Sequence, residues 1–269
     1  MTGQRLAVTS SLLFDCHAHT SDLSYCCDPE ITPQTYRAVL AQRPDLSGIA
    51  ITNHGFAVYF PASIAWSAEF IRDPSLFDQY RDFGNQRLEQ HLAEAEPLRE
   101  YGVFTGIEVE MMDDGRVTLD PQFRSRLEVM IGSVHFLPGV DPNVLDPEQT
   151  AAIWWEHTER LAAAGIDILG HPFRWIARTG RVPVTIAMIA RLVELAKRHR
   201  IALEINSHSV ISGDLELLSA CVQAGVEVAF GTDSHSVAEI GCLDYQVKLL
   251  AAAGLTPENV RLWVPARLR

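Results

Sequence analysis

The fold is decided by one stretch near the C-terminus, Val226-Glu227-Val228-Ala229-Phe230-Gly231-Thr232-Asp233-Ser234-His235. Its first half is a short, mostly apolar run with β-branched residues, which is typical of a strand buried on both faces. Its second half is a polar turn that carries a carboxylate and an imidazole. The stretch therefore predicts a buried parallel strand whose end presents groups able to bind a metal ion.

The same alternation recurs along the chain. Most gaps between the apolar runs are long enough for a helix, and helices are predicted at 33–41, 76–100, 147–164, 184–200 and 213–224. Alternating strands and helices imply parallel pairing. The six further runs are Leu12–Phe14, Gly48–Thr52, Val103–Val109, Leu127–Val134, Ile166–Leu169 and Ile201–Ile205.

Seven such units predict an α/β fold in the form of a distorted seven-stranded, TIM-like (β/α)7 barrel. We expect residues 1–269 to form one domain, with an insertion at about 56–100 after the second strand. A doubly wound open sheet is the structural alternative. The barrel is favoured because every strand ends in a polar or chelating group, and a parallel barrel gathers its chemistry at the carboxyl ends of its strands.

Composition narrows the class of protein. The 269 residues carry a formal net charge of -12, which disfavours extended nucleic acid and anionic membrane surfaces as partners. No run approaches the roughly 18 apolar residues of a membrane span, and residues 1–11 lack the apolar core of a signal peptide. Five cysteines without a CxxC motif indicate a reducing compartment. We therefore expect a cytoplasmic protein in which the adjacent Cys26 and Cys27 pack in a loop.

The polar groups at the strand ends form one chelating set. In His17-Ala18-His19 both imidazoles point to the same side of an extended strand, because strand periodicity is two. Asp15 is expected to accept an imidazole N–H, and Glu110 to support the ligands rather than bind metal. Imidazoles and carboxylates suit Zn, Mn or Fe, so the set predicts two or three divalent metal ions. Its other members are His54, Glu108, His135, His171, Asp233 and His235.

The pattern resembles the PHP (polymerase and histidinol phosphatase) family of metal-dependent phosphoesterases, in particular its small single-domain members. The resemblance runs in the family's order over residues 13–241. It implies a PHP-type barrel with a trinuclear site. The stretches that carry it are Asp15-Cys16-His17-Ala18-His19-Thr20, Ile51-Thr52-Asn53-His54, Gly106-Ile107-Glu108-Val109, Gly132-Ser133-Val134-His135, Leu169-Gly170-His171-Pro172, Glu204-Ile205-Asn206 and Gly231-Thr232-Asp233-Ser234-His235.

The resemblance also implies how the ligands are shared. The first metal would take His17, His19, Glu108 and Asp233. Glu108 would bridge to a second metal held by His135 and His171. A third metal would take His54, His235 and one residue from the loop after His19.

That loop departs from the family pattern. The histidinol-phosphatase type tends to place a histidine six residues after the second histidine of HxH, and this chain has Tyr25 there. Asp28 is the expected substitute, because it precedes a proline as in other members, and Asp22 is its competitor. The chain also has Asn53 where the family pattern has aspartate before the ligand histidine, which removes a charge and keeps an acceptor.

The favoured activity is hydrolysis of a small phosphomonoester, with histidinol phosphate a candidate by family alone. A metal-bridging hydroxide would attack phosphorus, and Glu108 and Asp233 would hold the metals. Arg174 would neutralise developing charge, and a bound water, Asp233 or His208 would protonate the leaving oxygen. Arg178 and Asn206 are further substrate-binding candidates, and the aromatic segment 56–72 either forms part of a lid or only packs.

Three other readings compete. The site could cleave phosphodiesters of nucleotides or short oligonucleotides as an exonuclease. It could hydrolyse amides or lactones, although barrels of that kind usually use a bridging lysine and no lysine precedes Lys197. It could also be a metal-binding barrel without turnover. The sequence makes no prediction about oligomeric state.

Overall fold

Seven parallel strands form the centre of the computed structural model, which describes residues 13–141 and 143–269. The segment in which we expected no signal peptide lies outside the described residues. The strands are β1 (Leu13–Ala18), β2 (Leu46–Ile51), β3 (Val103–Val109), β4 (Val129–Gly132), β5 (Ile168–Leu169), β6 (Ala202–Asn206) and β7 (Val228–Gly231).

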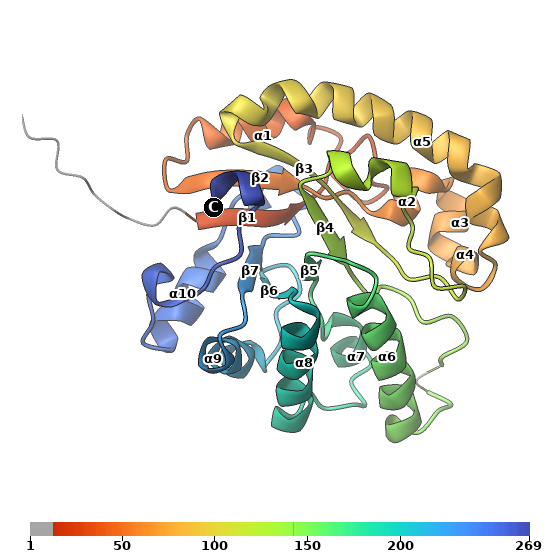
Figure 1. Cartoon of the computed structure of the whole chain (residues 1–269), viewed down its shortest axis with the longest axis vertical. Helices are drawn as coiled ribbons and strands as arrows, with labels where there is room; N and C mark the ends of the chain where they lie inside the picture. The colour runs from red at the N-terminus through yellow and green to blue at the C-terminus, as the bar shows by residue number, and fades with distance from the viewer. Residues whose placement is uncertain (1–12, 142) are drawn as a thin grey trace, which may run out of the picture.

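The strands follow one another around a ring in sequence order. Each is paired in parallel with the next from β1 to β7. Between β1 and β7 the described residues form a single parallel bridge, Ala18 with Ser234, and the Asp233 N–H donates to the His17 carbonyl at 2.7 Å. The fold is therefore a nearly closed α/β barrel of the TIM-like kind, as predicted, and the open-sheet alternative is wrong (Figure 1).

Helices form in each of the five predicted segments, and two helices that the sequence did not predict, at 174–178 and 244–252, also flank the ring. The N-cap of α6 is Asp146, whose side chain accepts from the Gln149 N–H, and α9 ends at Gly225, whose φ of 69° suits glycine. Among the described helices, none is long and apolar enough to cross a bilayer. The flanking helices are α1 (Pro33–Leu40), α6 (Pro147–Ala162), α7 (Arg174–Arg178), α8 (Ile186–His199), α9 (Asp214–Ala224) and α10 (Asp244–Ala252).

The segment between β2 and β3 is helical throughout. It forms α2 (Gly55–Tyr59), α3 (Ala62–Ser67), α4 (Glu69–Arg72), α5 (Ser75–Ala95) and the 3-10 helix η1 (Glu96–Tyr101). Figure 1 shows the long α5 lying over β2 and β3, on the opposite side of the strands from α6 and α8. Phe56, Phe60 and Phe70 are fully buried and pack against one another, whereas Trp66 is half exposed. Most of the aromatic segment thus packs, and one ring faces outward.

The interior of the ring is filled by the strands themselves. A distinct apolar cluster takes at least one residue from each of the seven strands, including Phe14, Phe104 and Ile168. Because every strand contributes, this cluster lies inside the ring and supports the strands from within. The bounds of β3 match the prediction, and those of the other strands differ from it by at most four residues at either end. The largest change is in β1, which extends through His17, so a ligand candidate lies within the ladder.

Candidate metal centre

Eight of the nine predicted metal ligands converge at the carboxyl ends of the strands. Their nitrogen and oxygen atoms fall into overlapping groups of three whose members lie within 4.8 Å of one another. This follows from parallel pairing, since each strand delivers its terminal side chain to the same end of the ring. Asp28 belongs to none of these groups among the described residues. The eight are His17, His19, His54, Glu108, His135, His171, Asp233 and His235.

Glu108 lies at the centre of the cluster. Its Oε2 atom is 3.4 Å from His17 Nε2 and 2.5 Å from His54 Nδ1. Its Oε1 atom faces the other side, 3.0 Å from His171 Nε2 and 3.5 Å from His135 Nε2. Two ligand atoms of one tetrahedral zinc ion, each bonded at 2.0–2.1 Å, lie about 3.3 Å apart. The two oxygens of one carboxylate thus face two separate sets of imidazoles, as a bridging ligand does.

Asp233, in the segment that follows β7, faces His17 and His19. Its Oδ1 atom accepts from His19 Nε2 at 2.9 Å and lies 3.7 Å from His17 Nε2. Asp233 and His171 both have positive φ, 51° and 24°, a region that non-glycine residues enter at a cost of about 1–3 kcal/mol. The backbone is strained at two ligand positions, where the strain turns each side chain into the cluster.

A third group combines His54 and His235 with His19, so His54 borders two groups. The rings of His19 and His54 stack with centroids 4.1 Å apart, and those of His19 and His235 are 4.7 Å apart. The Nδ1–H of His235 donates to the Asp233 carbonyl at 2.7 Å, which leaves its Nε2 atom for another partner. Cys26 Sγ lies 3.7 Å from His54 Nε2.

The three loop residues considered from the sequence as the last ligand, Tyr25, Asp22 and Asp28, are in none of the candidate metal groups among the described residues. The hydroxyl of Tyr25 donates to the Phe60 carbonyl at 2.7 Å. The carboxylate of Asp22 accepts from His91 Nδ1 at 3.2 Å. Asp28 is exposed, and its N–H donates to the His235 carbonyl at 2.9 Å.

Two buried carboxylates accept hydrogen bonds from three of the candidate ligand histidines. Glu204 Oε1 accepts from His17 Nδ1 at 2.9 Å, and Oε2 accepts from the His171 N–H at 2.5 Å. Gly231 makes room for this carboxylate, because a Cβ there would lie 2.0 Å from Glu204 Oε1. Glu110 accepts from His135 Nδ1 at 2.5 Å, which confirms its expected supporting role. The sequence analysis missed the role of Glu204.

The prediction for Asp15 is wrong. Its Oδ1 atom accepts from the Thr232 N–H at 2.9 Å, and its Oδ2 atom accepts from the Thr232 hydroxyl at 2.7 Å and the Gly241 N–H at 3.3 Å. It therefore ties β1 to the segment after β7 instead of orienting an imidazole. Burial raises the pKa of Asp15 to about 6, although hydrogen bonds from Thr232 oppose the shift.

The buried carboxylates make the cluster favour added positive charge. Burial acts to raise the pKa of Glu108, but His135, His17 and His54 hold it well below its usual range. Burial also lowers the pKa of His19 to about 3, so this imidazole is neutral at pH 7. Burial acts to lower the pKa of His17, yet the surrounding carboxylates raise it well above its usual value. The carboxylates thus favour a positive charge beside His17, which a proton or a metal ion supplies.

The residues fit divalent metal ions. Five imidazoles and two carboxylates in the cluster each have a buried nitrogen or oxygen without a hydrogen-bond partner among the described residues, and unpartnered buried polar atoms are rare. Neutral imidazole nitrogens and ionised carboxylate oxygens are the donors that Zn, Mn and Fe take. These atoms are His17 Nε2, His19 Nδ1, His54 Nδ1, His135 Nε2, His171 Nδ1, Glu108 Oε2 and Asp233 Oδ2.

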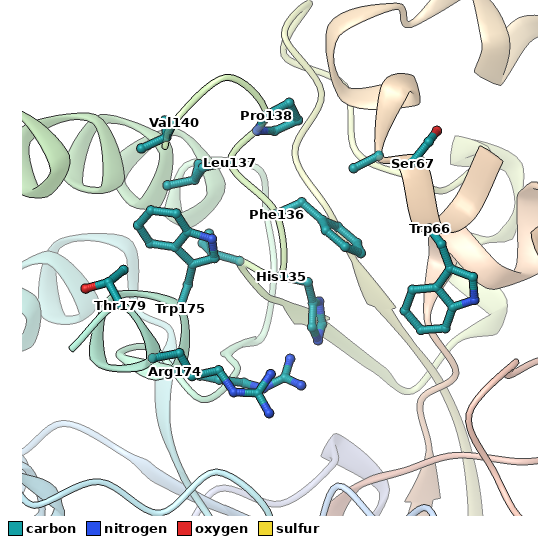
Figure 2. Close-up of a pocket in the computed structure, with 13 residues that line it drawn as sticks. Trp66, Ser67, His135, Phe136, Leu137, Pro138, Val140, Arg174, Trp175 and Thr179 are labelled. Atoms are coloured by element: carbon teal, nitrogen blue, oxygen red, sulfur yellow. The ribbon is translucent and has the colours of Figure 1, made fainter. Parts of the chain in front are cut away.

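A cavity of about 460 Å³ opens beside His135. Figure 2 shows Trp66 and Trp175 on opposite sides of it, with His135 between them and the side chain of Arg174 reaching towards the same space. The Nε atom of Arg174 is buried without a partner among the described residues. Arg178 also lines the cavity, and the nearby charge of Arg174 lowers the pKa of Arg178. Two cations and two indoles suit an anionic ligand with an organic group.

The other two substrate candidates lie at the end of β6. Asn206 is buried, and its Oδ1 atom accepts from the N–H groups of His208 and Ser209 at 2.9 Å each, while its Nδ2 atom is unpartnered within the described chain. His208 is partly exposed, and its Nδ1 atom lies 3.3 Å from Glu239 Oε1. Its ring centroid is 5.0 Å from that of His235, so it borders the cluster without joining it.

Fold and site together define the class: a TIM-like barrel with a cluster of side chains that could hold metal ions at the carboxyl ends of its strands. Residues 15–208 match the family model described as the PHP domain, and the chain belongs to that family. It is 26% identical over 231 residues to a probable phosphatase of Caldicellulosiruptor bescii, covering 82% of this chain and 80% of that protein. It is 25% identical to the probable phosphatase TTE1963 of Caldanaerobacter subterraneus, covering 93% and 86%. With the probable phosphatase YcdX of Escherichia coli it shares 27% identity, covering 62% and 66%.

Proposed function

We propose that this protein is a metal-dependent phosphoesterase that hydrolyses a small phosphomonoester at a site for up to three divalent metal ions. Membership of the PHP family and the probable phosphatases among its relatives make the chain a hydrolase of phosphoric esters. The observation that carries the finer proposal is Glu108, whose two oxygens face different sets of imidazoles. That arrangement supports two metal sites joined by one carboxylate.

When bound, the metal ions would lower the pKa of a water molecule towards neutrality and polarise the phosphoryl oxygens. The protein contributes orientation and charge. Glu204 and Glu110 fix the rings of His17 and His135, so that the opposite ring nitrogens face the cluster. Arg174 borders both His135 and the cavity, and there its guanidinium would donate to a phosphoryl oxygen and offset its charge.

The leaving oxygen needs a proton, and we assign its donation to His208 and a hydrogen-bond-accepting role to Asp233. Asp233 is buried in the cluster, and neighbouring imidazoles hold its pKa well below its usual range against the effect of burial, so it would act as an acceptor. His208, at the cluster's border, would donate a proton to the leaving oxygen. The unpartnered amide nitrogen of Asn206 is free to donate a hydrogen bond to the substrate. Trp66 and Trp175 would contact its organic part.

The test compares esters on protein loaded with manganese or zinc. We expect turnover of 4-nitrophenyl phosphate and much slower turnover of bis(4-nitrophenyl) phosphate. A preference for the diester would favour a phosphodiesterase. Glu108→Gln should lower turnover at least 100-fold, because an amide cannot bridge two cations as a carboxylate does. Glu194→Gln on the exposed face of α8 is the matched control. Unchanged turnover of Glu108→Gln at full metal loading would refute the proposal.

The substrate itself can be found by a screen. Phosphorylated metabolites with an aromatic or apolar organic group should be the best substrates, since indoles form two sides of the cavity. Release of inorganic phosphate is the measurement. Replacement of Trp175 by alanine should raise KM for the best substrate more than it lowers kcat, because Trp175 lies away from the metal cluster.

A further inference from the structure

We propose that the sulfur of Cys26 is the third protein ligand of the metal ion held by His54 and His235, in place of Asp28. The proposal rests on the metal-dependent function proposed above, and it concerns a residue that the sequence analysis assigned to loop packing. It makes this part of the site a Cys-His-His set, which is a zinc-type donor set and not a manganese-type one.

The distances support a shared metal ion. Cys26 Sγ is 3.7 Å from His54 Nε2. A tetrahedral zinc ion bonded to sulfur at about 2.3 Å and to nitrogen at about 2.05 Å holds these two donors about 3.6 Å apart. The sulfur also lies within 4.8 Å of a ring nitrogen of His235, and the donor atoms of His54, His235 and His19 lie within the same limit of one another.

The two imidazoles are aimed by hydrogen bonds and charges on their far sides. His54 is 4% exposed, and its Nδ1 atom lies 2.5 Å from Glu108 Oε2, so its Nε2 atom faces Cys26. The Nδ1–H of His235 donates to the Asp233 carbonyl, so its Nε2 atom is the one left to bind. The sulfur therefore lies beside two imidazoles whose remaining nitrogens are available to a metal ion.

The loop that carries Cys26 is fixed at both sides. Tyr25 donates to the Phe60 carbonyl in front of α3, and the Asp28 N–H donates to the His235 carbonyl. Arg87 of α5 donates to the Asp22 carbonyl. These bonds hold the exposed Cys26 beside His54, while Asp28, which is also exposed, belongs to no candidate metal group among the described residues and Asp22 pairs with His91. Both carboxylates considered from the sequence are thus engaged or turned away, and the residue after Tyr25 supplies the donor.

Cys27 is the natural rival and the natural control. Its sulfur also lies within 4.8 Å of Cys26 Sγ and of a nitrogen of His235, but among the described residues the sulfur that contacts a ring nitrogen of His54 is that of Cys26. Adjacent cysteines rarely bind one ion through both sulfurs, so we assign the ligand to Cys26 alone. Cys27→Ser should therefore leave metal binding unchanged within about twofold.

The experiment uses the full chain, freed of metal, kept reduced with a phosphine, and reloaded with Co²⁺. Bound thiolate gives a ligand-to-metal charge-transfer band in the near ultraviolet, and imidazole and carboxylate ligands do not. We expect the band in the wild type and in Cys27→Ser and its loss in Cys26→Ser. In parallel, Zn²⁺ should protect one thiol of the wild type from a disulfide reagent and none in Cys26→Ser. Cys26→Asp should fold, lack the band and bind Mn²⁺ at least tenfold more tightly relative to Zn²⁺ than the wild type does.

The outcomes separate this inference from the proposed function. Absence of the band in fully loaded wild type, or its persistence in Cys26→Ser, would overturn the assignment of Cys26 even if the protein hydrolyses phosphate esters. A band that depends on Cys26 supports the assignment even if no ester is hydrolysed. Circular dichroism of each variant shows that loss of the band is not loss of the fold.

Discussion

Glu204 offers the sharpest test of how the barrel builds its metal centre. It belongs to none of the candidate metal groups among the described residues, yet one oxygen accepts from His17 Nδ1 at 2.9 Å and the other from the His171 N–H at 2.5 Å. Glutamine has the same shape but only one acceptor oxygen. In either orientation of the amide, one N–H donor of the protein would face an NH₂ group. Glu204→Gln should therefore misplace one of the two ligand histidines in every molecule.

The expected magnitude follows from these two bonds. Loss of one supporting partner of a metal ligand typically costs 10- to 100-fold in metal affinity. Since Glu204 supports two ligands and is buried, we expect the upper end, about 100-fold or about 2.7 kcal/mol. The assay is competition for Zn²⁺ against a chromophoric chelator at fixed pH, with Glu194→Gln as the control on the surface of α8.

An unchanged Zn²⁺ affinity of Glu204→Gln would refute this expectation. If Glu204→Gln folds and keeps its Zn²⁺ affinity within threefold of the wild type, the hydrogen bonds to His17 and His171 do not orient the ligands. A drop in turnover without a drop in affinity would count against the same reasoning, because a positioning residue acts through the metal ion it helps to hold.

Three further predictions concern the substrate, the leaving group and pH. Arg174→Gln should lower kcat/KM about 10- to 100-fold with metal content unchanged, because it removes charged donors from the cavity. The surface variant Arg198→Gln is the control, and an equal loss of kcat/KM in that variant would contradict the prediction. His208→Gln should slow hydrolysis of an alkyl phosphate at least tenfold and change the rate of 4-nitrophenyl phosphate hydrolysis less than threefold, because nitrophenolate departs without a proton. Equal losses of rate on the two esters would exclude His208 as the proton donor. Burial raises the pKa of Asp214 to about 6 in the folded protein, above its value in the unfolded chain. The protonated form therefore stabilises the fold below the unfolded pKa, and this stability is lost as the pH rises through about 6. In urea unfolding of metal-free protein, the wild type should therefore lose stability relative to Asp214→Asn between pH 4 and pH 7, and a constant difference would contradict the shift.

The sequence predicted the ring and most of its metal cluster for the same physical reason. Strands buried on both faces read as apolar runs, and parallel pairing brings their ends together, so His17, Glu108 and Asp233 could be assigned to one site. The bounds of the strands were less predictable. A strand extends only as far as the adjacent strand pairs with it. Of the apolar run Ile166–Leu169, only Ile168 and Leu169 pair with β4 and form β5.

Two features could not be predicted because long-range contacts determine them. Glu204 lies inside β6, and nothing in the neighbouring sequence indicates that its carboxylate contacts His17 and His171. Glu204-Ile205-Asn206 was noted only as one of the stretches that carry the family resemblance. The loop after His19 is positioned by bonds to Phe60, Arg87 and His235. The family resemblance favoured Asp28 there, and the anchored loop instead brings the thiol of Cys26 beside the cluster.

The single bridge between Ala18 and Ser234 has a consequence for the metal-free protein. The first and last strands of the ring share few backbone hydrogen bonds, so the seam depends on side chains. The carboxylate of Asp15 supplies part of that closure, and the ligands on either side of the seam would supply the rest when they share an ion. Bound metal ions would then join β1 to the segment after β7 and close the barrel at this seam. Without them, amide hydrogens near the seam should exchange with solvent sooner than those between β2 and β3, and chain opening should begin there.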